Sequence, residues 1–374
     1  MSKRRLTAVL TAVILVIFLF MLLCGRKAVK PVLKKITGII SPLKHGISSA
    51  KRDYMLSREK PSGNVNHNYN ILVIKLDSQG NSQWSRTYGG AYYDWADQIV
   101  PVKDGGYVIA AKTYSFGEDY EGIYFLKIDS KGNSTDVYRF DGACDTVLNF
   151  ALDSGHLEAG RTYTDTGDNY GLNLANVGPD GEYKWIKTFG NNYFEWGCTA
   201  ISTKEGNYVT IGQPENIVER DLEDVSVYER DKEGNYKWNR RFGGDKYDRG
   251  YSISALKEGG YIISGLSCSL GKGMDDAYMI KLDEKGNSIW AKTYGGEDHD
   301  RAYAAEETND KGFIMAGSTM SYNNKGNFEM CVVKTDADGN TQWVKTYGGA
   351  GDYAAYSVAV AKDGGYVVAG AAGR

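Results

Sequence analysis

The chain has 374 residues, with 44 basic and 47 acidic side chains, and 42% of its residues are hydrophobic. This composition excludes a disordered chain and a membrane protein with many spans. Residues 1–60 contain 13 Lys or Arg and 2 Asp or Glu, which leaves a net charge of −14 in residues 61–374. Such an acidic body argues against nucleic acid as a partner, because phosphates bind basic surfaces.

The first predicted element is a membrane anchor. After the basic tail of residues 1–5 comes an uncharged apolar run, residues 6–24, whose length at 1.5 Å per residue matches the ~30 Å hydrocarbon core. We expect a transmembrane signal anchor here, followed by a basic juxtamembrane linker at residues 25–66. Two alternatives stay open, a cleaved signal peptide and a lipidated Cys24, although Leu23 stands where a lipoprotein signal has a small residue.

A sequence repeat dominates residues 67–374. Five of the six copies contain a turn of the type D-x-x-G-N, and the copy at Gly181 reads GPDGE. In most copies a Trp follows the turn, as in LDSQGNSQW and LDEKGNSIW. The turn glycines are Gly80, Gly132, Gly181, Gly234, Gly286 and Gly339. Successive glycines are separated by 52, 49, 53, 52 and 53 residues. A Y-G-G or F-G-G step and a second turn, such as D-G-G-Y, follow in most copies. Repeats of this length indicate a structure assembled from similar small units.

Each repeat is expected to form four antiparallel strands. In the first complete unit they are predicted at residues 96–103, 107–113, 123–129 and 135–140, because apolar and polar residues alternate there and Gly, Asn and Asp fill the turns. Four-stranded units at this spacing predict an all-β protein, a β-propeller. The predicted blades are residues 92–140, 143–189, 194–242, 247–294, 299–347, and 352–374 together with 71–88.

The last predicted blade combines the two ends of the repeat region. Residues 71–88 supply only the last two strands of a unit and residues 352–374 only the first two, so together they complete one sheet. The sequence thus predicts a six-bladed β-propeller of four-stranded antiparallel blades with N- and C-terminal (velcro) closure, preceded by one transmembrane helix. Such closure leaves no sheet edge exposed.

A tryptophan follows the turn glycine by four residues in five of the units and is expected to dock one blade on the next. The docking residues are Trp84, Trp185, Trp238, Trp290 and Trp343. Five cysteines and four histidines stand too far apart for metal-ligand spacing, so we predict no metal site and no cofactor.

The L-D-x-x-G-N-x-x-W, Y-G-G and D-G-G-Y motifs resemble those of secreted or surface bacterial and archaeal β-propeller repeat proteins, often called SBBP-like. The G-x-x-x-W step is similar to the tryptophan-docking motif of pyrroloquinoline-quinone propellers, although no quinone-site pattern is matched. The resemblance implies export, so we expect a single-pass protein of the cell membrane with an extracytoplasmic propeller. Basic residues after Cys24 favour the opposite orientation, which leaves a cytoplasm-facing interaction scaffold as an alternative.

The variable connections between strands form the candidate binding face, since the turns at the opposite end are uniform. A carboxylate precedes the first strand of most units and the residue after it varies. The candidate binding residues are Asp94, Trp95, Glu195, Trp196, Asp248, Arg249, Asp300 and Arg301. Aromatic rings beside carboxylates suit sugar rings or extended peptides. Alternatively, each carboxylate fixes its own connection through backbone hydrogen bonds.

The expected function is non-catalytic binding or scaffolding of a polysaccharide, wall polymer or protein. The sequence contains no nucleophile elbow, zinc-protease helix or phosphate loop, so no catalytic residue is predicted. The alternative is a glycan-active hydrolase or lyase that uses the rim carboxylates as acid and base. Repeated acids in repeated surroundings argue against this alternative, because an acid and a base need different environments.

Overall fold

The computed structural model of the chain describes residues 69–115, 122–140, 146–149, 156–163, 170–177, 183–189, 199–212, 224–232, 235–322 and 326–373, with only the backbone at 122–123 and 138–189. Every regular element in these ranges is a β-strand. Among the same residues no helix is long and apolar enough to cross a membrane. The predicted anchor at residues 6–24 and linker at 25–66 lie outside the described part of the chain.

The described strands pair into four-stranded antiparallel sheets, which confirms the all-β class predicted from the repeat. Three sheets contain β3 (Asp94–Pro101), β4 (Tyr107–Thr113), β5 (Gly122–Ile128), β6 (Ser134–Phe140); β7 (Thr146–Asn149), β8 (His156–Tyr163), β9 (Tyr170–Val177), β10 (Tyr183–Phe189); and β11 (Thr199–Ser202), β12 (Tyr208–Gly212), β13 (Val225–Arg230), β14 (Tyr236–Phe242). Three more contain β15 (Asp248–Ala255), β16 (Tyr261–Ser267), β17 (Asp276–Leu282), β18 (Ser288–Tyr294); β19 (Asp300–Glu307), β20 (Phe313–Thr319), β21 (Glu329–Thr335), β22 (Thr341–Tyr347); and β1 (Tyr69–Leu76), β2 (Ser82–Tyr88), β23 (Tyr353–Val360), β24 (Tyr366–Gly373).

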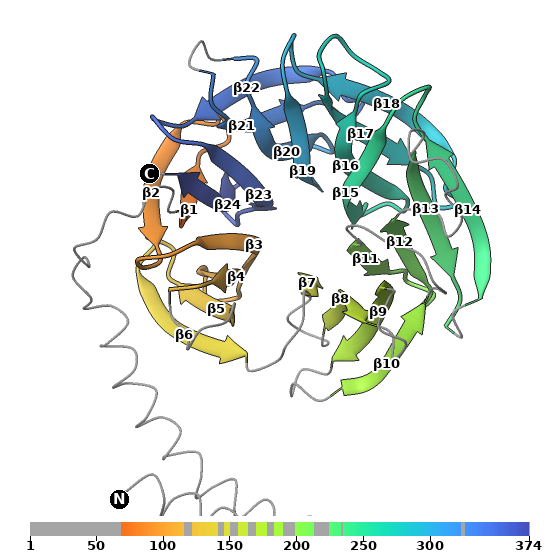
Figure 1. Cartoon of the computed structure of the whole chain (residues 1–374), viewed down its shortest axis with the longest axis horizontal. Helices are drawn as coiled ribbons and strands as arrows, with labels where there is room; N and C mark the ends of the chain where they lie inside the picture. Colours follow the sequence, from red (N-terminus) through yellow and green to blue (C-terminus); the bar gives the residue numbers. More distant parts are fainter. Residues whose placement is uncertain are drawn as a thin grey trace, which may run out of the picture. The chain divides into compact units, whose positions relative to one another are not determined.

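The sheet that contains β1 combines the two ends of the described chain in the order β2-β1-β24-β23. β1 pairs with β24 along its whole length, from Tyr69 opposite Gly373 to Leu76 opposite Tyr366. Within the described unit the sheets follow one another around a centre, with β3, β7, β11, β15, β19 and β23 innermost (Figure 1). We call the sheet of β1, β2, β23 and β24 the composite sheet.

The D-x-x-G-N turns are closed by the side chain of their first residue. Asp77 Oδ1 accepts hydrogen bonds from the N–H groups of Gln79 at 2.9 Å and Asn81 at 2.8 Å, and the Asn81 amide donates to Asp77 Oδ2 at 2.9 Å. Gly80 has a φ of 78°, a left-handed conformation that glycine adopts without strain. The same side-chain bonds close the turns at Asp129, Asp283 and Asp336. These bonds explain why Asp, Gly and Asn recur there.

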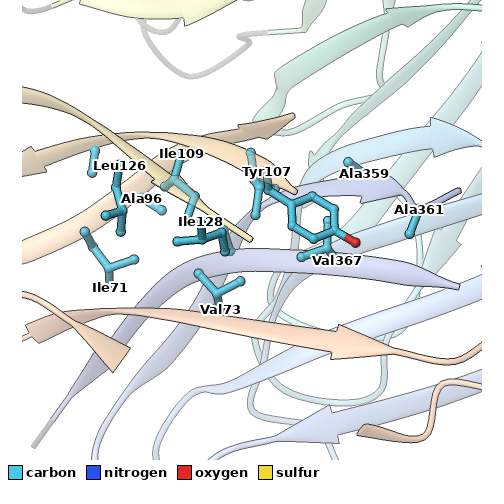
Figure 2. Packing of buried hydrophobic residues seen from close by; sticks show 13 residues of the cluster. Ile71, Val73, Ala96, Tyr107, Ile109, Leu126, Ile128, Ala359, Ala361 and Val367 are labelled. Carbon is cyan, nitrogen blue, oxygen red and sulfur yellow. The ribbon is translucent and has the colours of Figure 1, made fainter. Parts of the chain in front are cut away.

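Apolar side chains fill the space between neighbouring sheets. Figure 2 shows one cluster, in which Ile71 and Val73 of β1 pack with Ile109 of β4 and Ile128 of β5. Alternate residues of β1 point the other way, into a second cluster with β20 and β21 that includes Leu72, Ile74, Ile314 and Val332. The composite sheet is therefore covered on both faces, and β1 is accordingly apolar without interruption from Ile71 to Ile74.

A tryptophan and a tyrosine on the outer strand hold the turn of the next sheet. The Trp84 indole donates a 3.1 Å hydrogen bond to the Ser130 carbonyl, and the Tyr88 phenol donates a 2.6 Å bond to the Gly132 carbonyl. A side chain at Gly132 would lie 2.9 Å from the Trp84 ring, so glycine permits this close approach. Trp238, Trp290 and Trp343 lie in the same way against Gly286, Gly339 and Gly80. Trp185 belongs to β10, for which only the backbone is described.

A buried lysine anchors the first hairpin turn of some sheets. The side chain of Lys334 in β21 is 4% exposed, and its ammonium group lies 2.9 Å from Asp310 in the turn before β20. It also donates to the Thr335 carbonyl at 2.8 Å. Lys75 and Asp363 form the same pair in the composite sheet, at 2.8 Å. These ion pairs hold the turn at the end of the sheet opposite the connections.

Candidate functional site

The inner strands begin at one end of the sheets, which we call the connection face. It carries the segments between sheets and those between the second and third strands of a sheet. Its described parts are residues 89–93, 114–115, 224, 243–247, 268–275, 295–299, 320–322, 326–328 and 348–352. The opposite end carries the repeated hairpin turns. The predicted binding residues that the structure describes therefore lie at, or just below, the connection face.

The predicted carboxylates are buried beneath the connection face. Asp94, Asp248 and Asp300 expose 0%, 1% and 2% of their surface, respectively. Asp94 accepts hydrogen bonds from the Gly90 N–H at 2.8 Å, from the Ser115 hydroxyl at 2.6 Å and from the Thr113 hydroxyl. Burial raises the pKa of Asp94 against the lowering effect of these bonds. The other two carboxylates bind matching groups of their own connections. These side chains fix the connections, so a ligand on the surface contacts their neighbours instead.

A second acidic residue lies beside two of these carboxylates. A side chain at Gly295 would meet the Asp300 carboxylate and would lie 2.8 Å from Asp276 Oδ1. Burial, together with the neighbouring Asp300, raises the pKa of Asp276. Gly243 has the same place between Asp224 and Asp248. The available signal was an acidic residue at or just before the third strand, as in DVSVY and DAYMI.

The connection before β23 uses a tyrosine in place of the buried carboxylate. Tyr353 opens β23 at the register position that Asp300 holds in β19. Asp352 precedes the strand, is exposed, and accepts a 2.9 Å hydrogen bond from the Phe328 N–H. In the composite sheet the repeated position is therefore not a carboxylate, and Asp352, one residue earlier, bonds to the neighbouring connection instead.

Trp95 belongs to a group of four side chains that we call the aromatic cluster: Tyr69, Tyr93, Trp95 and Tyr114. Tyr93 stacks on Tyr69 at a centroid distance of 6.0 Å and meets Tyr114 edge-on at 6.4 Å, while Trp95 lies 6.1 Å from Tyr114. Tyr93 and Tyr114 each expose 42% of their surface, and the adjacent Tyr92 exposes 54%. The cluster joins the composite sheet to the sheet of β3–β6. It presents apolar ring faces with hydroxyl groups at their edges.

Arg301 lies half-buried at the start of β19 in a network of charged and aromatic groups. Its Nε donates a 2.8 Å hydrogen bond to Asp275 Oδ2, and Asp275 Oδ1 contacts Nδ1 of His299. The guanidinium carbon lies 5.2 Å from the centroid of Phe328. Burial alone would lower the pKa of Arg301, but hydrogen bonds to Asp275 and Tyr303 outweigh it and raise the pKa. Arg301 therefore carries its charge in a fixed position.

Three inner strands place a tyrosine at a β-bulge, a feature that the sequence analysis missed. The bulged residues are Tyr251 in β15, Tyr303 in β19 and Tyr356 in β23. A bulge takes its residue out of the ladder and re-aims the side chain. The ring centroids of Tyr251 and Tyr303 are 5.0 Å apart, as are those of Tyr303 and Tyr356. The rings therefore form a row across three sheets, and Asp97 has the equivalent bulge position in β3.

Two of the predicted binding residues, Glu195 and Trp196, lie outside the described residues. Of the others, Trp95 and Arg301 join the surface groups described above, and Arg249 lies over Tyr251 with its guanidinium carbon 5.3 Å from the ring centroid. Beside Asp300 is a cavity of about 10 Å³, room for a single water molecule and far too small for a sugar. Within the described ranges no three His, Cys, Asp or Glu side chains come together as a metal site.

Several four-stranded antiparallel sheets, with strands as the regular elements of the described residues, fit a β-propeller. Neither a protein-family model nor a curated protein matches the sequence.

A comparison with solved structures returns matches at low identity. A Penicillium chrysogenum α-L-arabinanase complexed with arabinobiose is 10% identical, with 73% of this chain and 91% of that chain covered and a TM-score of 0.45. An α-L-arabinofuranosidase from Fusarium graminearum is 11% identical over 73% and 91% of the chains, with a TM-score of 0.45. The WD40 domain of Neurospora crassa Pan2 is 11% identical over 74% and 88%, with a TM-score of 0.40.

Proposed function

We propose that the protein is a non-catalytic polysaccharide-binding protein, built as a closed six-bladed β-propeller and held at the outer side of the cell membrane by residues 6–24. The observation that carries the binding proposal is the aromatic cluster on the connection face. Two of its rings, Tyr69 and Trp95, belong to strands of two different sheets, so the backbone fixes the spacing of these two rings before a ligand arrives. A rigid platform of this kind loses little entropy on binding.

The chemistry of the aromatic cluster suits sugars. Stacking on the exposed Tyr93 and Tyr114 rings and the half-buried Trp95 ring covers the apolar faces of a pyranose. The hydroxyl groups of the sugar need donors and acceptors at the ring edges. Burial raises the pKa of Tyr69, with further contributions from Asp352 and Tyr93, so the Tyr69 phenol stays a donor. The exposed Asp352 carboxylate supplies an acceptor close to it.

The buried carboxylates favour binding over hydrolysis. A glycosidase needs two accessible carboxyl groups on either side of the scissile bond, about 5 Å or about 6.5–9.5 Å apart. Asp94, Asp248 and Asp300 are instead covered by their connections and accept hydrogen bonds from them. Moving one of them to a sugar would break the connection that it holds.

The six-bladed ring is supported by the composite sheet and its neighbours. Pairing of β1 with β24 places strands from both ends of the described chain in one sheet. Apolar clusters join that sheet to the sheet of β3–β6 on one side and to the sheet of β19–β22 on the other. The motifs that resemble surface propeller repeats support the assignment to that group and the outward orientation. Protease treatment of intact cells tests the orientation, because an outward propeller is degraded without lysis.

A glycan array with the full chain, followed by calorimetric titration, tests the binding proposal. In the variants Trp95→Ala and Tyr114→Ala, affinity for a bound glycan is expected to fall about tenfold each, since one aromatic contact contributes ~1 kcal/mol or more. The matched control is Tyr236→Ala, which removes a 47%-exposed tyrosine from the outer strand β14. Unchanged binding in both cluster variants would reject the proposed surface, and release of shorter sugars by the wild-type chain would favour the hydrolase.

A further inference from the structure

Two arginines converge on the row of bulge tyrosines. Arg249 and Arg301 hold the same register position in the neighbouring strands β15 and β19. Arg249 lies over the Tyr251 ring, and Arg301 bonds to Tyr303. Both guanidinium groups act on the Tyr251 phenol electrostatically. Two positive charges therefore lie around one aromatic ring at the inner edge of the connection face.

The position of Arg301 is fixed before any ligand binds. Asp275, which is 5% exposed, accepts the Nε–H at 2.8 Å, and the Phe328 ring lies against the guanidinium group. The Nε–H is one of five N–H donors of an arginine. A planar guanidinium group held in this way is suited to bind two oxygens of one oxyanion through parallel hydrogen bonds.

The tyrosine row adds uncharged donors beside the arginines. Burial raises the pKa of Tyr251 and Tyr356 above the ordinary value for tyrosine, so their hydroxyl groups remain protonated. The row ends close to Asp97, which acts on the Tyr356 phenol. Asp97 follows Trp95 by two residues in β3. Tyr69 of the aromatic cluster also acts on the Tyr356 phenol, so the row that begins at the arginines ends close to that cluster.

We infer that Arg249, Tyr251, Arg301, Tyr303 and Tyr356 form a site, the arginine–tyrosine site, that binds the carboxylate of an acidic sugar. This inference rests on the proposed polysaccharide binding and names its ligand class: a chain that carries uronic acid units. One unit places its carboxylate between the arginines while another part of the chain stacks on the aromatic cluster. Polymers with neutral sugars engage the cluster alone and bind more weakly.

Calorimetric titration of the full chain in detergent with oligogalacturonate and with its methyl ester tests the inference. The two probes share their ring faces and hydroxyl groups and differ in charge. Esterification is expected to weaken binding about tenfold, because charge-assisted hydrogen bonds contribute ~1.5–3 kcal/mol. Binding of the acid is also expected to weaken as salt rises, while binding of the ester changes little.

Substitutions of the two arginines test where the carboxylate of the acidic sugar binds. Arg249→Gln is expected to weaken binding of the acid about tenfold and binding of the ester less than twofold. Arg301→Gln is expected to weaken binding of the acid and the ester to the same extents as Arg249→Gln. Because it also leaves the buried Asp275 with one fewer partner, the melting temperature of this variant is measured in parallel. If Arg301→Gln does not fold, Arg249→Gln alone tests the inference. The matched control is Arg86→Gln, an exposed arginine on β2 with the same change in charge.

Each outcome separates the two proposals. Equal affinity for acid and ester would overturn the arginine–tyrosine site and leave polysaccharide binding in place. Acid-specific binding that persists in Arg249→Gln and in a folded Arg301→Gln would also overturn it, because the carboxylate then binds elsewhere. Arginine-dependent binding of a poly(glycerol phosphate) in place of the uronate would reject the acidic sugar as the ligand. No binding of acidic or neutral glycans would reject both proposals.

Discussion

The phenol of Tyr347 donates a 2.5 Å hydrogen bond to the carbonyl of Gly80, 267 residues earlier in the sequence. Tyr88 and Tyr294 make the equivalent bond to Gly132 and Gly339. The junction between the sheets of β11–β14 and β15–β18 differs, because Phe242 stands at the tyrosine position and the buried Trp238 indole nitrogen has no hydrogen-bond partner. This junction lacks both of those bonds, and the described hydrogen bonds that cross it run from Arg240 to the Lys285 carbonyl at 3.4 Å and from the Thr199 hydroxyl to the Tyr251 carbonyl at 2.7 Å.

Tyr347→Phe is expected to lower the free energy of unfolding by ~1 kcal/mol, the net contribution of one hydrogen bond. The reverse change, Phe242→Tyr, is expected to raise it by a similar amount, because the new phenol would reach the Gly286 carbonyl. Urea denaturation followed by tryptophan fluorescence measures both. Tyr92→Phe, at an exposed position, serves as the control, and a Phe242→Tyr variant no more stable than wild type would contradict the prediction.

The Lys334–Asp310 pair predicts an asymmetry between its two partners. Asp310→Ala is expected to destabilise by ~2–3 kcal/mol, because it leaves an ammonium group that is only 4% exposed without its carboxylate. Lys334→Met costs less, since the remaining carboxylate is 55% exposed and hydrated. Asp104→Ala is a matched control in the sheet of β3–β6, where the partner Lys127 is 35% exposed and the loss is smaller. Equal losses in Asp310→Ala and Asp104→Ala would contradict the argument.

Acidification is expected to weaken the same ion pairs. Partial burial would raise the pKa of Asp310 and Asp363, but hydrogen bonds, including those from Lys334 and Lys75, outweigh it and lower the pKa in the folded state. Such carboxylates stabilise the fold above their unfolded pKa, near 3.8, and lose that contribution as pH falls through the folded pKa. Thermal melting between pH 5 and pH 2 measures the loss, which should be reduced in Lys334→Met.

Glu306 in β19 predicts a pH dependence of opposite sign. Burial raises the pKa of Glu306 to about 7 from 4.5, with Glu307 adding to the effect and Lys257 opposing it. The folded chain then binds a proton that the unfolded chain has released, so stability falls as pH rises from about 4.5 to 7. Glu306→Gln is expected to flatten the melting temperature over this range. An unchanged slope in Glu306→Gln would assign the dependence to another group, and Glu297→Gln, at an exposed position before β19, is the control.

Deletion of residues 366–373 is expected to abolish cooperative unfolding, because β1 loses its partner along its whole length and both adjoining apolar clusters lose side chains. A synthetic peptide with the β24 sequence YVVAGAAG should restore part of the melting transition by adding a strand in trans. A peptide of the same composition in scrambled order is the control. A deletion variant that melts like wild type would disprove this role of β24.

Local patterns were sufficient to predict most strands. The interval predicted at residues 107–113 coincides with β4, and Gly and Asn mark the turns because their backbone requirements are local. Strand pairing between residues 71–88 and 352–374 followed from counting incomplete repeats, a global property that the sequence also contains. Predicted starts at residues 96, 123 and 135 lie one or two residues beyond the observed starts of β3, β5 and β6.

Side-chain roles were harder to predict. The acidic residues before the inner strands allowed two interpretations, a binding rim or side chains that fix their own connections. Asp94 and Asp300 have the second arrangement, enclosed by a Thr hydroxyl at the end of the second strand and a Ser hydroxyl of the connection after it. A bulge such as that at Tyr303 adds one residue to the strand, and the pattern of polar and apolar residues does not show where that residue lies. Both the burial of the carboxylates and the positions of the bulges depend on which residues lie opposite one another in the folded sheets, and the spacing of residues in the sequence does not specify this.

Pairing of Tyr69 with Gly373 brings the two ends of the described chain side by side. The chain could therefore begin and end at a different point of the sequence while each sheet keeps the same neighbours in space. A circularly permuted gene, with these ends joined by a short Gly-Ser peptide and new ends opened at the Gly105 turn, would encode the same set of neighbours. In such a permutant a covalent link would connect β1 to β24, which are joined only by hydrogen bonds and side-chain packing in the present chain.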